Sequence, residues 1–453
     1  MQTFISKLEK YLMPVAEVIT KNKYLVAIRD GFLLATPLLI VGSFFMLIAN
    51  FPVQAYLDWL KSTEILGTTL AKIISIPANT TFNLMAIFAI VGFGHSFSKQ
   101  IGINPGSGSV IGLIAWFMLM PQFVLAEPEG MEAIRIAALP MDWVGAKGLF
   151  VGIFSVFLSL HIFKAIYDKG WIIRMPKGVP PTVSESFSGM IPGAFVLIVF
   201  LGINLLFKAT PWEDAFNFIF NFLQLPLQNI SDSMGAMVIV YLFAHILWFL
   251  GIHGTQITDT VFNPILYALS AENQAALAAG LPLPHIINKQ FQDLFATYGG
   301  AGSTLSLLIA ALIFCKSKRV TELAKLSVIP ACFGINEPVI FGLPIVLNPI
   351  IAIPFILVPV LNIVVAYLTM SMGLVPICNG VLMPWTTPPI ISGFLASGWQ
   401  GSVLQFIMII VGIFIYMPFI KAVDDGYLKD EAAAESAGDD EEVSFDDISF
   451  DEL

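Results

Sequence analysis

The sequence predicts an all-α polytopic membrane protein with about ten transmembrane helices. Hydrophobic residues make up 57% of its 453 residues and charged residues only 12%, and its mean hydropathy is +0.83. This composition excludes an ordinary soluble fold. The apolar residues also gather into nine segments separated by polar or turn-forming residues. The segments cover residues 28–50, 83–97, 107–126, 148–166, 189–208, 235–252, 302–315, 345–370 and 403–422.

The first residues, Met1 to Lys23, carry apolar side chains at helical spacing and lysines on the opposite face. This pattern predicts an amphipathic helix that lies on the cytoplasmic surface of the membrane. Basic residues in the loops that follow indicate the cytoplasmic side and predict that both termini are cytoplasmic. They are Lys99, the set Lys164, Lys169, Arg174 and Lys177, the set Lys316, Lys318, Arg319 and Lys325, and the pair Lys421 and Lys429.

Residues 253–302 are polar, yet the chain has to cross the membrane within them. The apolar segments that end at Ile252 and Cys315 both run from outside to inside, so the chain must return outward between them. No long apolar run is available for this return, and charged residues such as Asp259 and Lys289 interrupt it. We therefore predict a polar, interrupted crossing in this stretch.

The segment Phe333–Pro344 (FGINEPVIFGLP) places the carboxylate of Glu337 among apolar residues. A charge at the centre of a membrane helix costs about 2.5 to 3.5 kcal/mol on insertion scales, so it normally faces water or a partner. Pro338 disfavours helix at Glu337, and glycines lie on both sides. The segment is therefore predicted to be a broken or re-entrant element that lines a wet cavity, and it is the first candidate for a substrate site.

Polar residues are sparse up to about residue 230 and accumulate from Met234 onward. We therefore predict a scaffold and dimerisation half at 1–230, which includes the amphipathic helix, and a substrate-binding transport domain at 231–429. The remaining residues, 430–453, hold eleven of the 32 acids and no base, which leaves 22 bases against 21 acids in residues 1–429. We predict that this acidic tail is disordered and cytoplasmic.

Three further residues are candidates for substrate contacts. His253 lies between two glycines and is either a structural histidine or a ligand-contact or proton-relay residue. His285 follows two prolines in the polar stretch, and the same two interpretations apply. Trp385 lies between prolines, where its ring either joins the interfacial aromatic belt or offers a flat face to a sugar. The three cysteines form no CxxC pair, so neither a metal site nor a cofactor is predicted.

Four motifs together carry a resemblance to a known family. They are GIHG (Gly251–Gly254), GINEPVIFGLP (Gly334–Pro344), MPKGVPPTVSESF (Met175–Phe187) and GGAGSTL (Gly299–Leu305). With the amphipathic start, they closely resemble the membrane IIC component of the bacterial phosphotransferase system, in its lactose/cellobiose/chitobiose family. The similarity extends over residues 1 to about 425.

The resemblance implies a homodimer in the bacterial inner membrane, whose second half contains two re-entrant hairpins and binds a β-linked disaccharide. His253 and Glu337 would lie near the sugar hydroxyl that receives a phosphoryl group, with Asn336 and Trp385 as further sugar contacts. The donor would be a phosphocysteine on a separate IIB protein, itself served by IIA, because none of the cysteines lies in a soluble α/β segment. The chain would then be the membrane subunit of a phosphoenolpyruvate-dependent sugar phosphotransferase, embedded in lipid and without a nucleic-acid partner.

Phosphoryl transfer to a hydroxyl requires positioned reactants, a group that takes the hydroxyl proton and compensation for the phosphate charge. Glu337 is suited to accept the proton, whereas His253 would hydrogen-bond the hydroxyl or, when protonated, offset the phosphate. The sequence leaves open which of the two takes the proton. A rival hypothesis is a secondary symporter, in which His253 and Glu337 relay protons and the sugar stays unmodified.

Overall fold

The structure is a computed structural model that describes residues 18, 21–49, 51, 54–126, 134–176, 178–343, 345–346 and 348–439. The predicted amphipathic helix at residues 1–23 lies almost entirely outside the described residues, as does the end of the acidic tail from residue 440 onward. The backbone of Glu337 is described but its side chain is not.

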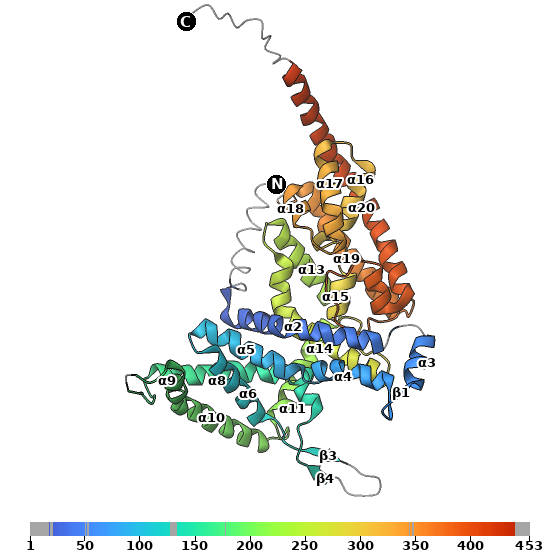
Figure 1. Cartoon of the computed structure of the whole chain (residues 1–453). Helices are drawn as coiled ribbons and strands as arrows, with labels where there is room; N and C mark the ends of the chain where they lie inside the picture. The colour runs from blue at the N-terminus through green and yellow to red at the C-terminus, as the bar shows by residue number, and fades with distance from the viewer. Residues whose placement is uncertain are drawn as a thin grey trace, which may run out of the picture.

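The first half of the chain consists of helices and two short hairpins (Figure 1). The helices are α2 (Lys23–Ala49), α3 (Gln54–Ser62), α4 (Leu70–Phe82), α5 (Met85–Ile101), α6 (Pro105–Leu119), α7 (Met141–Val144), η1 (Ala146–Gly148), α8 (Leu149–Asp168), α9 (Pro181–Ser188) and α10 (Met190–Lys208). The antiparallel hairpins pair β1 (Glu64–Ile65) with β2 (Thr68–Thr69), and β3 (Val124–Ala126) with β4 (Ile134–Ile136). Neither hairpin is among the elements that the sequence predicts.

The rest of the chain is helical and contains several short elements (Figure 1). They are α11 (Ala215–Ile219), the π-helix η2 (Phe220–Gln224), α12 (Leu225–Ser231), α13 (Met234–Phe249), α14 (Gly254–Ala279), α15 (Lys289–Phe295), η3 (Ala301–Ser303), α16 (Thr304–Phe314), α17 (Lys318–Cys332), α18 (Glu337–Gly342), α19 (Pro349–Ser371) and α20 (Ile391–Asp439). Side-chain caps define where several of them begin, because an oxygen accepts from backbone N–H groups of the first turn. Ser317 caps α17 in this way and Asn348 caps α19.

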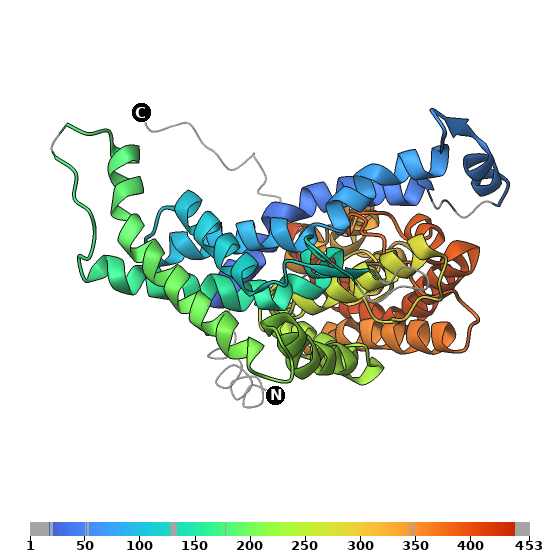
Figure 2. The same ribbon diagram turned by 90° about the horizontal axis from the view of Figure 1, so that it is seen from below.

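The two halves of the chain each contain a large hydrophobic core. One is built mainly from α2, α5, α6 and α8, and the other from α13 to α20. Within the first core α2 and α5 approach closely at glycines, since a Cβ atom on Gly31 would lie 2.6 Å from the backbone nitrogen of Phe93. Tyr267 of α14 packs in the first core as well, where its ring stacks on Phe32 at 5.2 Å. The halves therefore share a packed seam, and Figure 2 shows α2 lying along the second half.

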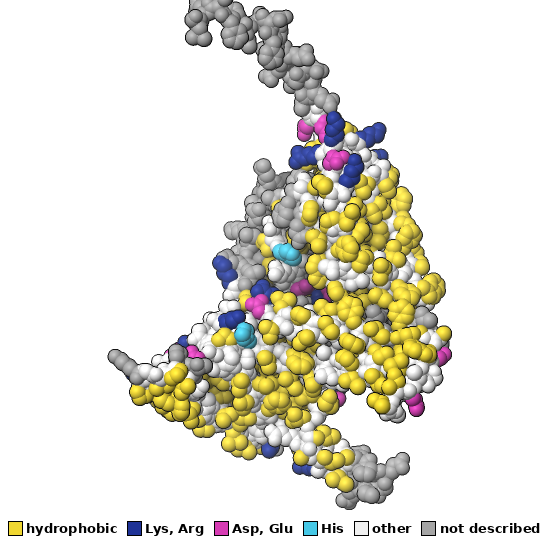
Figure 3. Space-filling model, viewed as in Figure 1, with side chains coloured by type: hydrophobic (Ala, Val, Ile, Leu, Met, Phe, Trp, Pro, Cys, Tyr) yellow, Lys and Arg dark blue, Asp and Glu magenta, His cyan; other side chains and the backbone are white. Residues whose placement is uncertain are grey.

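Six helices of the described part of the chain are long and apolar enough to cross a membrane, and three shorter apolar helices accompany them. The six are Lys23–Met46, Leu70–Ile101, Leu149–Asp168, Val183–Lys208, Pro349–Ser371 and Ile391–Ala432, and the shorter ones are Pro105–Leu119, Met234–Phe249 and Ala301–Phe314. Each of the predicted apolar segments overlaps one of these helices. Hydrophobic side chains cover broad areas of the surface, while charged ones gather where α16, α17 and α20 meet (Figure 3). The total of about ten crossings and the re-entrant hairpins remain predictions.

The helices are interrupted in both stretches for which the sequence predicts irregular backbone, the segment around Glu337 and residues 253–302. Between α17 and α18 the chain is not helical, and Gly334 adopts a φ of 79° that favours glycine. The stretch 253–302 contains a continuous polar helix, α14, followed by an irregular connection. Helix α20 bends at Ser397 and Gly398 and continues to Asp439. It therefore runs into the segment that the sequence predicts to be disordered.

Candidate substrate-binding site

A cavity of about 510 Å³ opens between α2 and the second half of the chain. Helix α2 contributes one wall, with Arg29, Leu33, Thr36 and Ile40. The other walls come from α13, α14 and α15, from the turn at Gly299–Ala301, and from two irregular segments around Asn336 and Trp385. Such a volume suits a small organic ligand, and the mixture of aromatic and polar walls suits one with hydroxyl groups.

His253 lies at the start of α14 and lines this cavity. Its Nδ1 accepts a hydrogen bond from the backbone N–H of Gln256 at 3.3 Å, which caps the helix. Because a backbone N–H donates to Nδ1, this nitrogen carries no proton, and the neutral ring has its proton on Nε2. The ring lies 4.3 Å from that of Trp248, measured between centroids. His253 can thus offer the cavity one N–H donor, which suits a hydroxyl oxygen.

Asn336 connects the break before α18 to the GGAGSTL turn. Its side-chain nitrogen donates to the carbonyl of Ala301 at 2.8 Å and to Oγ1 of Thr304 at 3.0 Å. The residue is almost completely buried, so its amide fixes the wall of the cavity at this point. Glu337 follows at once as the first residue of α18, although its side chain is outside those described.

Trp385 lines the cavity and is 58% exposed. Its ring lies directly against Gly334, where a Cβ atom would come within 3.0 Å of the indole. A glycine at this point therefore lets the ring pack closely against the break in the chain. The structure brings His253, Asn336 and Trp385 to the lining of one cavity, and their role as substrate contacts stays a prediction.

A charged cluster in the cavity was not assigned to the site from the sequence. The Lys289 ammonium lies 2.8 Å from Asp293 and 3.7 Å from Asp259, and it donates to Oε1 of Gln292 at 3.0 Å. Its side chain is only 7% exposed. Spacing indicates only that Gln256, Asp259 and Asn263 fall on one face of a helix, and it does not show that Asp259 pairs with Lys289.

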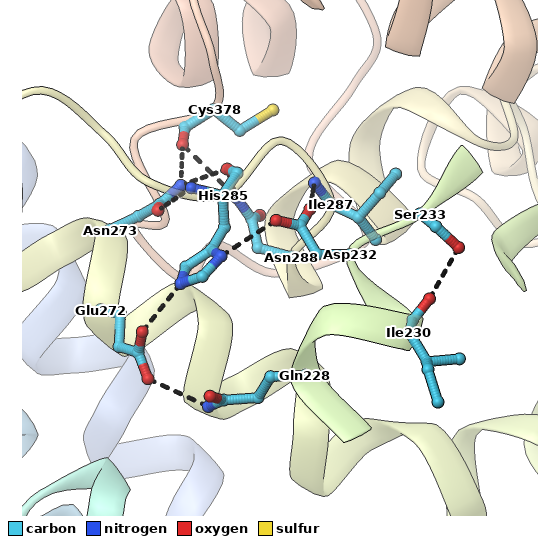
Figure 4. A network of polar contacts seen from close by, with 10 residues as sticks. All are labelled: Gln228, Ile230, Asp232, Ser233, Glu272, Asn273, His285, Ile287, Asn288 and Cys378. Carbon is cyan, nitrogen blue, oxygen red and sulfur yellow. Dashed lines mark hydrogen bonds and ion pairs between the residues drawn. The ribbon is translucent and has the colours of Figure 1, made fainter. Parts of the chain in front are cut away.

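The structure does not bring His285 to the cavity, because this residue lies in a separate network between α14 and α15 (Figure 4). Its Nδ1 is 3.0 Å from a carboxylate oxygen of Asp232, and its Nε2 is 2.8 Å from one of Glu272. Both ring nitrogens must donate to satisfy two carboxylates, which requires the charged imidazolium. Beside the ring, the Asn273 amide donates to the carbonyls of His285 and Cys378. The network thus joins the end of α12 to α14 and to the segment after α19.

The pH dependence of stability tests this network. His285 lies outside the helices that could span the membrane. Burial alone would lower the pKa of His285, but the hydrogen bonds and charges of Asp232 and Glu272 raise it from 6.5 to about 9. Because the pKa is raised in the folded state, the stabilisation is fully present below about pH 6.5 and is lost as the pH rises through about 9.

We expect His285→Gln to lower the free energy of unfolding at pH 6 by about 1.5 to 3 kcal/mol, the usual value of hydrogen bonds to charged groups. The gap between variant and wild type should close above pH 9. Thermal unfolding in detergent at several pH values measures this, with His95→Gln as the matched control. A gap that is constant across the pH range would show that the charged ring is not what stabilises the network.

The comparisons with known proteins agree with this architecture. The family model described as "Phosphotransferase system, EIIC" matches residues 29–359. The chain belongs to the EIIC family of the phosphotransferase system. Within the described residues of this EIIC chain, no group of three or more histidine, cysteine or acidic side chains could hold a metal ion.

Several EIIC relatives match over nearly their whole length. The chain is 39% identical to the oligo-beta-mannoside-specific EIIC component of Bacillus subtilis, over 95% of this chain and 97% of that protein. It is 38% identical to the cellobiose-specific EIIC component of Geobacillus stearothermophilus, over 96% and 97% respectively. The crystal structure of ChbC, the IIC component of the N,N'-diacetylchitobiose-specific system, matches with a TM-score of 0.90 and 36% identity, over 94% of this chain and 99% of that one. The EIIC chain is therefore a multi-pass membrane permease of the ChbC fold.

Proposed function

We propose that this EIIC protein binds a β-linked disaccharide of the cellobiose or N,N'-diacetylchitobiose type, carries it inward and presents a hydroxyl to a phosphorylated IIB protein. The observation that carries the proposal is the convergence of His253, Asn336 and Trp385 on one cavity beside the start of α18. The names of the relatives agree, because all three refer to β-linked sugars. IIA would act indirectly, by phosphorylating IIB.

The chemistry assigns distinct roles to the polar residues. The sugar lies against the Trp385 ring. The Nε2–H group of His253 donates to the hydroxyl that receives the phosphoryl group, and this fixes the orientation of the hydroxyl. The hydroxyl oxygen then forms a bond to phosphorus as the bond from phosphorus to the IIB cysteine sulfur breaks. The hydroxyl proton passes to the carboxylate of Glu337, and the sulfur leaves as a thiolate. Since His253 is neutral and already carries a proton on Nε2, Glu337 is the better proton acceptor of the two.

We further propose a homodimer formed by the first half, with lipid around it and both termini in the cytoplasm. The candidate span Val183–Lys208, which contains α10, is the least buried of the six, since only 17% of its most apolar stretch is buried within one chain. Its exposed side chains include Ile198, Leu201, Leu205 and Leu206. Such an exposed apolar face suits contact with a second copy of the chain or with lipid.

Uptake by membrane vesicles tests the proposed function. Phosphotransfer predicts that sugar phosphate accumulates inside, and only when phosphoenolpyruvate and the soluble phosphotransferase proteins are supplied. We expect this result with at least one of cellobiose, β-mannobiose and N,N'-diacetylchitobiose, and no effect of an uncoupler. Unmodified sugar inside, together with loss of uptake when an uncoupler is added, would instead identify a proton-coupled symporter.

A further inference from the structure

We infer that Arg29 of α2 is the phosphate-binding residue of this protein, and that its guanidinium contacts the phosphoryl group as it passes to the sugar. The inference rests on the proposed function, because it concerns the charge that arrives with the phosphoryl donor. A transferring phosphoryl group carries its negative charge on three oxygens, and proteins usually stabilise that charge with arginine, lysine or a metal ion.

Two of the three basic side chains that line the described cavity are already committed to other contacts. His253 accepts a backbone N–H on Nδ1, so its ring is neutral and cannot offset phosphate charge. Lys289 is held by Asp293, Asp259 and Gln292 and is only 7% exposed. Its two acidic neighbours more than cancel its charge, so an anion gains little from approaching it.

Arg29 differs from both in its contacts. Its Nε and one terminal nitrogen both donate to the same oxygen of Asp30, at 2.8 and 2.7 Å. Among the described residues nothing else pairs with the guanidinium, so the N–H groups of the second terminal nitrogen can donate to an oxyanion. The side chains of Arg29 and Asp30 are 29% and 38% exposed, so a phosphate can also compete with the carboxylate. Arginine suits this role because its planar fork binds two oxygens of a phosphate at once.

Arg29 also lies on the side of the membrane from which the phosphorylated IIB protein would approach. It lies near the start of α2, in the part of the helix that the loop charges place toward the cytoplasm. Asp30 neutralises the guanidinium until a phosphate arrives, so an uncharged sugar meets no excess positive charge. During transfer Arg29 forms and breaks no covalent bond. It only stabilises the charge on the phosphoryl oxygens while the bond to the hydroxyl oxygen forms and the bond to the donor sulfur breaks.

The test compares the affinities of cellobiose and of cellobiose 6′-phosphate for the purified protein. In Arg29→Gln we expect the dissociation constant of the phosphate to rise about 10- to 100-fold, as is usual for a lost charge-assisted contact. That of cellobiose should stay within about a factor of two, which also shows that the variant is folded. Arg29→Lys should fall between wild type and Arg29→Gln, because it keeps the charge without the fork.

Arg135→Gln is the matched control, since Arg135 is exposed on β4 and packs over the ring of Phe123 instead of lining the cavity. Raising the ionic strength should weaken phosphate binding in wild type and in this control, but much less in Arg29→Gln. Unchanged phosphate affinity in Arg29→Gln would overturn the inference, and so would an equal loss for both ligands. If wild-type protein binds cellobiose too weakly, the same comparison is made with β-mannobiose or N,N'-diacetylchitobiose and its phosphate. Wild-type protein that binds none of the three sugars would instead overturn the proposed function, and the inference with it.

Discussion

Replacement of Glu337 by glutamine is expected to remove most of the phosphorylation activity and to leave sugar binding nearly intact. Glutamine keeps the shape of the side chain but cannot take the hydroxyl proton. General base catalysis typically accelerates a reaction by about 10² to 10⁴-fold, and the rate of sugar phosphate formation should fall by a factor in this range. Initial rates with saturating phosphorylated IIB, alongside equilibrium sugar binding, separate the two effects.

Glu322→Gln is the matched control for this experiment. Glu322 is an exposed glutamate of α17 that pairs with Lys325 at 2.7 Å and does not line the cavity. Its replacement should change neither binding nor rate, because exposed ion pairs contribute little. Full-rate phosphorylation by Glu337→Gln would refute the proposed role of the carboxylate. A loss of binding that matches the loss of rate would assign Glu337 to the sugar alone.

The second large effect is expected at His253. In His253→Ala the sugar loses the Nε2–H donor, and α14 loses the acceptor that caps the N–H of Gln256. Binding should weaken by about 3- to 10-fold for the lost hydrogen bond, and the phosphorylation rate should fall with it. The lost cap should also lower the stability of the protein by about 0.5 to 2 kcal/mol.

His253→Asn separates these two contributions, because asparagine is a good helix cap but has no ring nitrogen in the same place. We expect it to restore the unfolding temperature of His253→Ala without restoring sugar affinity. If His253→Asn recovers both, the histidine acts only through the helix and the structural interpretation is correct. Uptake per folded protein provides the same distinction in vesicles.

The sequence predicted the parts of the fold that membrane physics constrains most tightly. Apolar segments had to become helices, since the hydrocarbon core offers no partner for backbone polar groups. The segment around Glu337 had to break, because glycine and proline interrupt it on both sides of an isolated carboxylate. The convergence of His253, Asn336 and Trp385 was expected from the resemblance and not from their spacing, which extends over more than a quarter of the chain.

The charged cluster and the His285 network could not be predicted in the same way. Lys289 pairs with Asp259, thirty residues earlier, and His285 pairs with Asp232 in the turn between α12 and α13. Hydropathy along the chain indicates that burying such a charged group costs free energy. It does not indicate which partner offsets that cost. For this reason the sequence predicts an interrupted crossing where the structure has the continuous helix α14. The polar side chains of α14 form hydrogen bonds with α15 and with the segment after α19, which the sequence does not reveal.

Because α2 contributes one wall, the cavity lies between the part of the chain that contains the first core and the part that contains the second. Arg29 lies on the part that contains the first core, whereas His253 and Trp385 lie on the other. A displacement along the contact between Phe32 and Tyr267 would therefore alter the opening to the membrane surface and the alignment of Arg29 at the same time. Under the proposed function, access to the cavity and phosphoryl transfer would then be coupled, and the sugar would enter the cytoplasm as its phosphate.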